Sequence, residues 1–226
     1  MSPFDSKLRK YHSNHLYGFG YDRLTDDYLV VSISYHPYNA SSHLEFFSLR
    51  NIIWKQIEIE GTHLSYMNST CDPRSKRGVL FNGAIHWLAF YYDLYVFVIV
   101  AFDLMERKLF EIPLPDHDFD YQSRYCHLWV FGEFLSLLGG DFQNGTTEIW
   151  VMKESWWTKT LVLPPGYFYP IYTTKNNDII GKNGFDSLVK YNDQGQQFGF
   201  HSCWDGPYQA VMYTESLLSL PDNDQV

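Results

Sequence analysis

The segment Asp116-His117-Asp118-Phe119-Asp120-Tyr121 has the residue types best suited to chemistry, because it combines three carboxylates with an imidazole and two aromatic rings. Carboxylates and histidine can bind a metal ion or transfer protons. The segment lies on a connection between two runs of apolar residues. A solvated loop is therefore the simplest interpretation, and a metal site and a loop that contacts a protein partner are the alternatives.

The other histidines and carboxylates do not form a catalytic pattern. The sequence contains no GxSxG, HExxH or GxGxxG motif. His12 and His15 lie in a polar, unpatterned stretch typical of a solvated tail, and His86 lies inside an apolar strand, which favours a packed side chain. Asp103 directly follows a strand and is predicted to cap the backbone amides of a turn. We therefore predict no catalytic, cofactor-binding or metal-binding residues and no cofactor.

The composition is that of a folded domain rich in aromatic residues. The 226 residues are 45% hydrophobic, 19% charged and 19% aromatic, and the formal net charge is −9. This balance excludes an intrinsically disordered chain, and the aromatic residues favour sheet over helix. An acidic surface with scattered Lys and Arg repels phosphate backbones, so nucleic acid is not expected as a partner.

Neither an export signal nor a membrane segment is expected. The first fifteen residues are polar, and the longest apolar run, 94–102 (LYVFVIVAF), has nine residues, far fewer than the roughly 20 of a membrane helix. Cys71, Cys126 and Cys203 are widely spaced and are expected to be buried apolar residues in a reducing compartment. We therefore expect a protein of the cytoplasm, the nucleus or both, without membrane contact.

Two segments, 81–115 and 131–165, share one order of features. Each contains a turn, an apolar strand, a loop, a second apolar strand, a polar turn, an aromatic residue and an ending of apolar residues and proline. Phe102 and Met152 hold matching places about fifty residues apart. A repeat of this length is typical of stacked or radial all-β architectures, and four short strands make one propeller blade.

The first half of the chain is predicted to contain two such units. In the first, a strand at 28–35 precedes a hairpin of 44–49 and 53–59, and a long polar connection follows at 60–78. The second unit turns at Asn82-Gly83, a dipeptide in which both residues tolerate positive φ. Its strands are expected at 79–81, 84–90, 96–102 and 108–114.

The second half is predicted to contain two more units. The Gly139-Gly140 pair is expected to end a strand before a loop at 139–146, an order that resembles the kelch repeat. The chain is thus predicted to be an all-β, kelch-like β-propeller, incomplete and with about four blade-like units of antiparallel strands. The expected strands are 129–131, 134–138, 147–152 and 156–163, then 167–173, 178–181, 187–191 and 196–201, and a last strand at 208–220.

Several motifs carry a resemblance to a known family. They are 17–22 (YGFGYD) with Asp26-Asp27-Tyr28, Phe47-Ser48-Leu49 with Trp54-Lys55, 81–89 (FNGAIHWLA), 99–104 (IVAFDL), 111–115 (EIPLP), 148–154 (EIWVMKE) with Trp157-Thr158-Lys159, and 213–217 (YTESL). Together they resemble the plant F-box-associated domain, in the type 1 form of F-box/kelch-repeat and S-locus F-box-like proteins. The resemblance implies a domain at 15–220, between a polar N-terminal tail at 1–14 and an acidic C-terminal tail at 221–226.

The resemblance also implies a function. Such a domain is the substrate-recognition module of an SCF-type ubiquitin ligase and selects a protein, here of unknown identity, for ubiquitination. Only fourteen residues precede the domain expected at 15–220, too few for an F-box, so a Skp-type adaptor and a cullin are expected as partners only of a longer form. A truncated, non-functional gene fragment and a kelch-like propeller enzyme are the alternative readings.

Propellers bind through the loops between units and between their second and third strands, and aromatic residues there contribute binding energy. We therefore predict partner-contact loops, with blade packing as the alternative for each aromatic side chain. The candidates are Tyr91, Tyr92, Asp93 and Tyr95 on one loop, Asp116, His117, Asp118 and Tyr121 on a second, and Phe168 and Tyr169 on a third.

Overall fold

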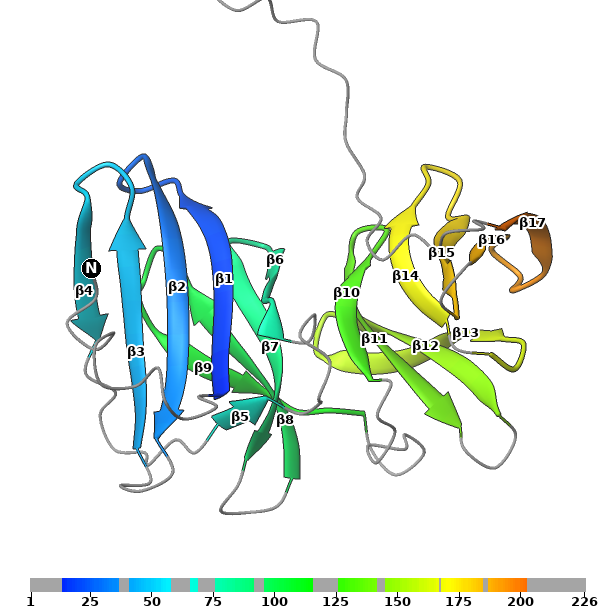
Figure 1. The fold of residues 1–226 in the computed structure, drawn as a ribbon, viewed down its shortest axis with the longest axis horizontal. Helices are drawn as coiled ribbons and strands as arrows, with labels where there is room; N and C mark the ends of the chain where they lie inside the picture. Colours follow the sequence, from blue (N-terminus) through cyan, green and yellow to red (C-terminus); the bar gives the residue numbers. More distant parts are fainter. Residues whose placement is uncertain are drawn as a thin grey trace, which may run out of the picture.

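The computed structural model describes residues 14–36, 41–57, 66–68, 76–91, 96–115, 126–141, 145–166, 168–184 and 187–202. Most of these residues lie in β-strands or in the turns that join them, and no α-helix is assigned within these ranges. The strands form four antiparallel sheets that follow one another along the chain (Figure 1). The predicted all-β architecture of blade-like units is confirmed.

Each sheet is one blade. The first blade contains β1 (Asn14–Asp22), β2 (Asp27–His36), β3 (Ser41–Ser48) and β4 (Ile53–Ile57). The second contains β5 (Tyr66–Asn68), β6 (Val79–Phe81), β7 (Ala84–Tyr91), β8 (Val96–Asp103) and β9 (Leu109–Ile112). The third contains β10 (His127–Phe131), β11 (Phe134–Asp141), β12 (Thr146–Lys153) and β13 (Trp156–Leu163), and the fourth contains β14 (Phe168–Thr173), β15 (Ile179–Asn183), β16 (Ser187–Tyr191) and β17 (Gln197–Ser202).

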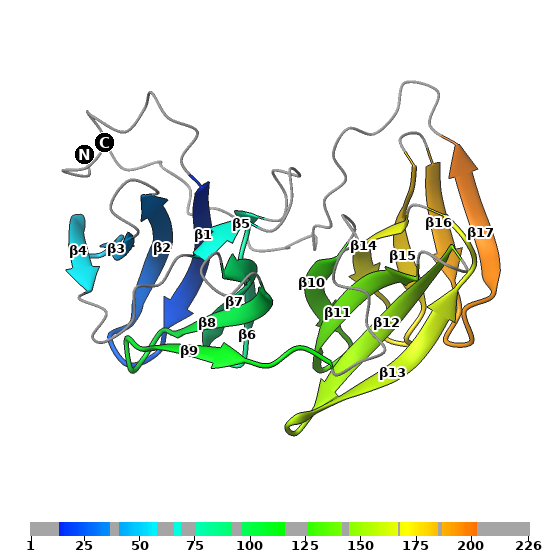
Figure 2. The same ribbon diagram turned by 90° about the horizontal axis from the view of Figure 1, so that it is seen from below.

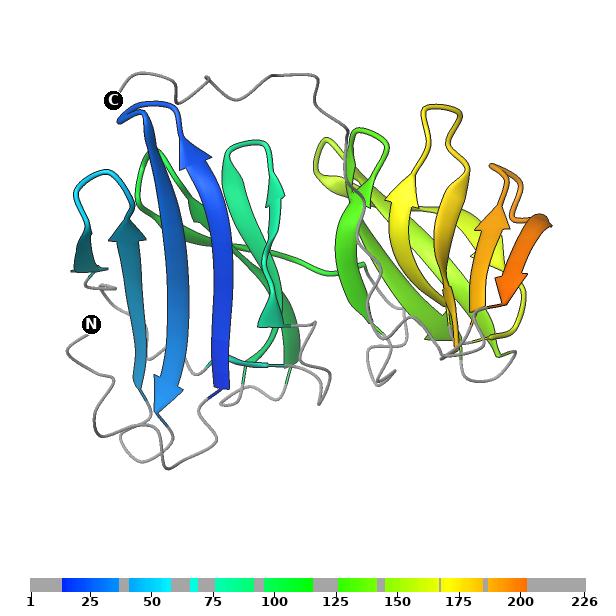
Figure 3. The ribbon, with the colours of Figure 1, turned by 45° about the horizontal axis from the view of Figure 1, so that its top comes forward.

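The blades are arranged as in a propeller, with the inner strand of each blade beside the inner strands of the next. β1 lies against β5 and β6, and β10 lies against β6 and β14. Tyr17 and Arg77 form a parallel bridge, and the Gly78 amide donates a hydrogen bond of 2.7 Å to the Tyr17 carbonyl. The first and fourth blades lie at opposite ends in every ribbon view (Figures 1, 2 and 3), so the described blades form an open arc.

The fifty-residue repeat is confirmed for three strands of the second blade and their counterparts in the third. β6 and β10 end at Phe81 and Phe131, and β8 and β12 end at Asp103 and Lys153. β7 and β11 likewise begin and end fifty residues apart. The predicted turn at Asn82-Gly83 joins β6 to β7 with φ values of 46° and 78°. Asparagine and glycine are the residues that adopt positive φ most readily, which explains why the turn forms at this dipeptide.

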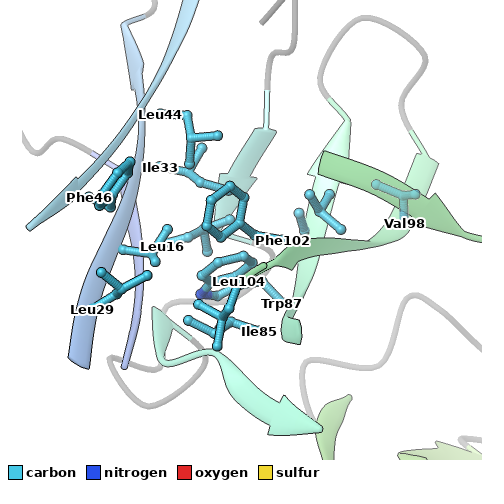
Figure 4. Packing of buried hydrophobic residues seen from close by; sticks show 13 residues of the cluster. Leu16, Leu29, Ile33, Leu44, Phe46, Ile85, Trp87, Val98, Phe102 and Leu104 are labelled. Carbon is cyan, nitrogen blue, oxygen red and sulfur yellow. The ribbon is translucent and has the colours of Figure 1, made fainter. Parts of the chain in front are cut away.

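An apolar cluster joins the first blade to the second (Figure 4). Side chains alternate across a strand, so every second residue of β1 and β2 faces the neighbouring blade. Leu16, Leu29 and Ile33 are fully buried against Ile85 and Phe102 of the second blade. Two further clusters join the second blade to the third and the third to the fourth. Apolar side chains therefore hold each successive pair of blades together.

Trp87 lies at the centre of the first interface. Its side chain is 1% exposed, and its Nε1 donates a hydrogen bond of 3.0 Å to the Tyr17 carbonyl. Gly18 and Gly78 flank it: a Cβ on Gly18 would lie 2.4 Å from Ile85 Cγ2, and one on Gly78 would lie 2.6 Å from Trp87 Nε1. Both positions require glycine because the strands of the two blades approach so closely here.

Three details of the predicted strand pattern are wrong. No strand was predicted at β1, and His15, predicted to lie in a solvated tail, is half-buried in that strand. The segment 60–78, predicted to be a connection, contains β5, which pairs with the end of β7 while β6 pairs with its beginning. Three residues are too few to show an alternation in the sequence. Gly139 and Gly140 do not open a loop, since both continue β11 and pair with Glu148 and Thr147. The predicted strand at 208–220 lies outside the described residues.

Candidate protein-contact surface

The turns that join the first strand to the second and the third to the fourth lie at one edge of every blade. In Figure 3 the β6–β7, β10–β11 and β14–β15 turns follow the upper edge of the molecule. We call this edge the turn face. The described residues form two grooves there: the 1–2 groove between the first and second blades and the 3–4 groove between the third and fourth.

Asp22, at the end of β1, ties the first blade to the second. Its carboxylate is fully buried and accepts hydrogen bonds from the Leu24 amide at 2.9 Å and from Thr25 Oγ1 at 2.5 Å. It also pairs with Arg107 Nη2 at 2.5 Å, and the Arg107 guanidinium lies 4.8 Å from the centre of the Phe46 ring. Burial alone would raise the pKa of Asp22, but these hydrogen bonds and Arg107 hold the pKa below its ordinary value.

Asp27, at the start of β2, fastens the second turn of the same blade. Its carboxylate accepts hydrogen bonds from Ser48 Oγ and, at 2.9 Å, from the Arg50 amide. The hydrogen bond from Ser48 lowers the pKa of Asp27. Ser48 Oγ in turn accepts a hydrogen bond of 3.0 Å from the Asn51 amide. The 49–52 turn is therefore held to the 22–27 turn by side chains as well as by the sheet.

Three aromatic rings are exposed above these turns, and we call Phe19, Tyr21 and Tyr28 the aromatic surface. Phe19 is 53% exposed and Tyr28 is 50% exposed. Their rings stack with centroids 5.5 Å apart and an angle of 2° between planes, and the Tyr21 ring packs 5.0 Å from Tyr28. The Tyr21 hydroxyl donates a hydrogen bond to the Asp26 carboxylate, which raises the pKa of Tyr21.

The 1–2 groove adjoins the aromatic surface at Tyr21. It has a volume of about 530 Å³ and is lined by Tyr21, Arg23, Leu80 and Met105. Leu80 is 47% exposed and Met105 is 49% exposed. Asp103 fixes the turn that carries Met105, since its Oδ1 accepts hydrogen bonds of 2.8 and 2.7 Å from the Met105 and Glu106 amides. The predicted capping role of Asp103 is confirmed.

His86 is packed in β7, as predicted. It is 4% exposed, and the rings of Phe81 and Phe110 meet it edge-on at 6.1 and 6.4 Å. Burial lowers the pKa of His86. Among the residues that the structure describes, no group of three or more His, Cys, Asp or Glu side chains is placed to hold a metal ion.

Most of the predicted contact residues fall outside the described ranges. These are Tyr92, Asp93, Tyr95, Asp116, His117, Asp118 and Tyr121, while Tyr91 is the last residue of β7 and only its backbone is described. The prediction for Phe168 is wrong: it is 5% exposed in β14 and packs 5.3 Å from the Tyr191 ring. Tyr169 also lies in β14, half-buried, with its ring 4.9 Å from the ring of His127.

Sequence reasoning passed over the aromatic surface. The signal was present in 17–21 (YGFGY), where aromatic residues alternate with glycine. Because side chains alternate across a strand, this pattern places every ring on one face and leaves the other face free for close packing. The motif that marks the family resemblance therefore also indicates the aromatic surface.

No helix within the described ranges is long and apolar enough to cross a membrane. Cys126, predicted to be buried, is 4% exposed between the second and third blades. Cys71 and Cys203 lie outside the described residues.

The chain is similar to two plant F-box proteins. It is 25% identical over 155 residues to an F-box/kelch-repeat protein of Arabidopsis thaliana, covering 66% of this chain and 40% of that protein. It is 24% identical over 233 aligned positions to F-box protein CPR1 of the same plant, covering 89% of this chain and 55% of CPR1. The chain therefore spans about half the length of these relatives.

Among solved structures, the isopeptidase AtxE2 aligns loosely, with a TM-score of 0.38 and 12% identity. The alignment covers 70% of this chain and 24% of that chain. A family model for the F-box associated beta propeller domain (FBA_3) matches residues 4–184. The family expected from the motifs is confirmed, although the form that matches is FBA_3 and not the expected type 1. The match covers most of the chain, which therefore belongs to the F-box associated beta-propeller domain family.

Proposed function

We propose that this domain is the substrate-recognition module of an SCF-type ubiquitin ligase receptor and that it contacts its target protein through the aromatic surface. The observation that carries the proposal is the group of three exposed, mutually packed rings, which lie beside turns fixed by the hydrogen bonds of Asp22 and Asp27. Tyr and Phe rings supply large contact areas at protein interfaces. The target itself stays unidentified.

The way these rings are held supports a binding role. Phe19 and Tyr28 already stack on each other, and Tyr21 is fixed by its hydrogen bond to Asp26. Side chains that are ordered before association lose little conformational entropy when a partner binds. Arg23 and Arg50 border the rings, and arginine is enriched at protein interfaces. The surface thus has both the composition and the rigidity of a contact site.

Coupling to the ligase belongs to a longer form. The relatives named as F-box proteins are about twice as long as the part that this chain matches. We propose that the Skp-type adaptor and the cullin act on a form that carries an F-box, in the cytoplasm or the nucleus, while the domain described here selects the target.

A reconstituted ubiquitination assay tests this proposal. The chain is joined to an F-box, target candidates are cross-linked in plant cells with the proteasome inhibited, and each candidate is purified and offered to the assembled ligase. Phe19→Ser with Tyr28→Ser should abolish ubiquitin transfer to the true target. The matched control is Phe198→Ser with Phe200→Ser, which removes two rings that are 54% and 62% exposed on β17.

Two results would contradict the proposal. One is a set of candidates that the F-box-linked chain never ubiquitinates, or ubiquitinates equally well without the aromatic surface. The other is binding of the adaptor by the 226-residue chain alone, which would place the coupling inside this domain.

A further inference from the structure

The 3–4 groove differs from the aromatic surface in both position and chemistry. It has a volume of about 650 Å³ and lies between the β10–β11 turn and the β14–β15 turn. Lys153 and Lys175 line it together with one carboxylate, Glu133. The lining charges thus sum to +1 on a chain whose net charge is −9. A positive groove on an acidic protein attracts an anionic group locally.

Both lysines are open to a ligand. Neither Lys153 nor Lys175 forms an ion pair with any residue that the structure describes. The Lys153 ammonium lies 5.7 Å from the centre of the Phe134 ring, which also lines the groove. Asp178 directly follows Asn177, which lines the groove, and its carboxylate already pairs with Lys190 at 3.2 Å. The groove cations therefore lack a carboxylate partner among the described residues.

Thr173 supplies an independent indication of a ligand. It lines the groove, and its hydroxyl oxygen is buried without a hydrogen-bond partner among the described residues. Buried polar atoms nearly always have a partner, and leaving one unsatisfied is unfavourable. The oxygen is covered by its neighbours, so a carboxylate in the groove would accept a hydrogen bond from it once the covering side chains move aside. A ligand with such an oxygen therefore satisfies both the hydroxyl and the lysines.

The walls of the groove are ordered before any ligand binds. The Thr174 amide donates a hydrogen bond of 2.9 Å to the Asp178 carbonyl, and the Asp178 amide donates one of 3.1 Å to Thr174 Oγ1. The Asn177 amide closes the same turn by donating a hydrogen bond of 3.0 Å to the Thr174 carbonyl. Phe134 and Tyr172 add aromatic rings to the lining. The groove thus offers an apolar wall beside its cations.

We propose that the 3–4 groove binds an acidic peptide segment of a partner protein. A glutamate or aspartate side chain of that segment lies near Lys153, Lys175 and the Thr173 hydroxyl, and a neighbouring apolar side chain packs on Phe134 and Tyr172. The inference rests on the proposed function only in taking the ligand to be part of a protein. It adds a second contact site that does not involve the aromatic surface.

A peptide titration of the full chain tests the inference. The probe is a fluorescein-labelled decapeptide with four glutamates around one tryptophan, and the measurement is fluorescence anisotropy. We expect saturable binding that weakens about ten-fold in Lys153→Gln with Lys175→Gln, because two charge pairs are lost. Lys108→Gln is the matched control, since Lys108 is exposed and pairs with Glu106 away from the groove.

Thr173→Val separates binding from folding. Valine has nearly the shape of threonine without the hydroxyl, so we expect peptide binding to weaken about five-fold through the lost hydrogen bond. The thermal midpoint should stay the same or rise, because an unsatisfied hydroxyl is removed. A stabilised variant that binds the peptide as well as the wild type would show that the hydroxyl has no ligand, and would overturn its role.

Three further outcomes decide the proposal. It is overturned if the glutamate peptide does not bind saturably, or if the double lysine variant binds it equally well. It is also overturned if a peptide with glutamine in place of glutamate binds equally well. A phosphoserine peptide that binds more than ten-fold tighter than the glutamate peptide would overturn it too, by assigning the groove to phosphate. Phe19→Ser with Tyr28→Ser should leave peptide binding unchanged, so failure here is distinct from failure of the proposed function.

Discussion

The 1–2 groove and the 3–4 groove occupy similar places on the turn face but use charge in opposite ways. Beside the 1–2 groove, the buried Asp22 and the partly exposed Arg107 form an ion pair that crosses from one blade to the next. Around the 3–4 groove, the ion pairs of described residues stay within a blade, as between Lys190 and Asp178. Lys153 and Lys175 remain without a carboxylate partner in the part of the chain that the structure describes.

The repeat shows how this difference arises. In the second blade the turn between β8 and β9 contains residues 104–108, and Arg107 is one of them. In the third blade only Glu154 and Ser155 separate β12 from β13, so this shorter turn has no arginine that could reach the neighbouring blade. A blade backbone that repeats leaves its turn residues free to vary, so one turn fastens two blades while its counterpart leaves cations available for a ligand.

The largest effect is expected from removing the packing that supports the 1–2 groove. Trp87→Ala should lower the free energy of unfolding by about 3–5 kcal/mol, because it leaves a cavity between two blades. The measurement is urea unfolding followed by circular dichroism. Trp156→Ala is the matched control, since Trp156 is 75% exposed. Equal stability of the two variants would show that the blade interface is not the core described here.

A smaller effect is expected from the partly buried ion pair of Asp22 and Arg107. Asp22→Asn should lower the free energy of unfolding by about 1–3 kcal/mol, because Arg107 loses its partner and the turn loses charged hydrogen bonds. Since folding lowers the pKa of Asp22, its contribution is present above the unfolded pKa of about 4 and is lost as pH falls below it. Asp22→Asn should therefore lose less stability than the wild type when the pH falls from 5 to 3.

The exposed Asp26→Asn is the control for that measurement. Asp26 pairs with Arg50 at 3.5 Å, with both side chains more than half exposed, and exposed pairs contribute little. If Asp26→Asn and Asp22→Asn lowered the free energy of unfolding equally, the ion pair beside the 1–2 groove would not distinguish it from the 3–4 groove.

The smallest effect is expected from His86. Burial lowers the pKa of His86, so the fold is favoured above the unfolded pKa of about 6.5 and loses stability as pH falls through it. His86→Gln should flatten the stability profile between pH 7 and 5 by less than about 1 kcal/mol. Burial also lowers the pKa of His15, so some slope should remain. The control is His201→Gln, which replaces a histidine at an exposed position.

Features that depend on neighbouring residues were predicted correctly. The Asn82-Gly83 turn and the amide cap of Asp103 each follow from a few adjacent residues. The role of Phe168 was predicted wrongly, because an aromatic residue at the start of a strand looks the same in sequence whether it faces solvent or a neighbouring blade. Only the position of the third blade's strands shows that Phe168 is buried.

The sequence by itself determined the blade pattern, the fifty-residue period and the family, because these depend on local alternation, turns and motifs. Tertiary structure decided which residues meet. Asp22 and Arg107 are 85 residues apart, and the Thr173 hydroxyl is buried beside two lysines only because the third and fourth blades pack together. Such contacts depend on the packing of whole sheets, so no short stretch of sequence contains them.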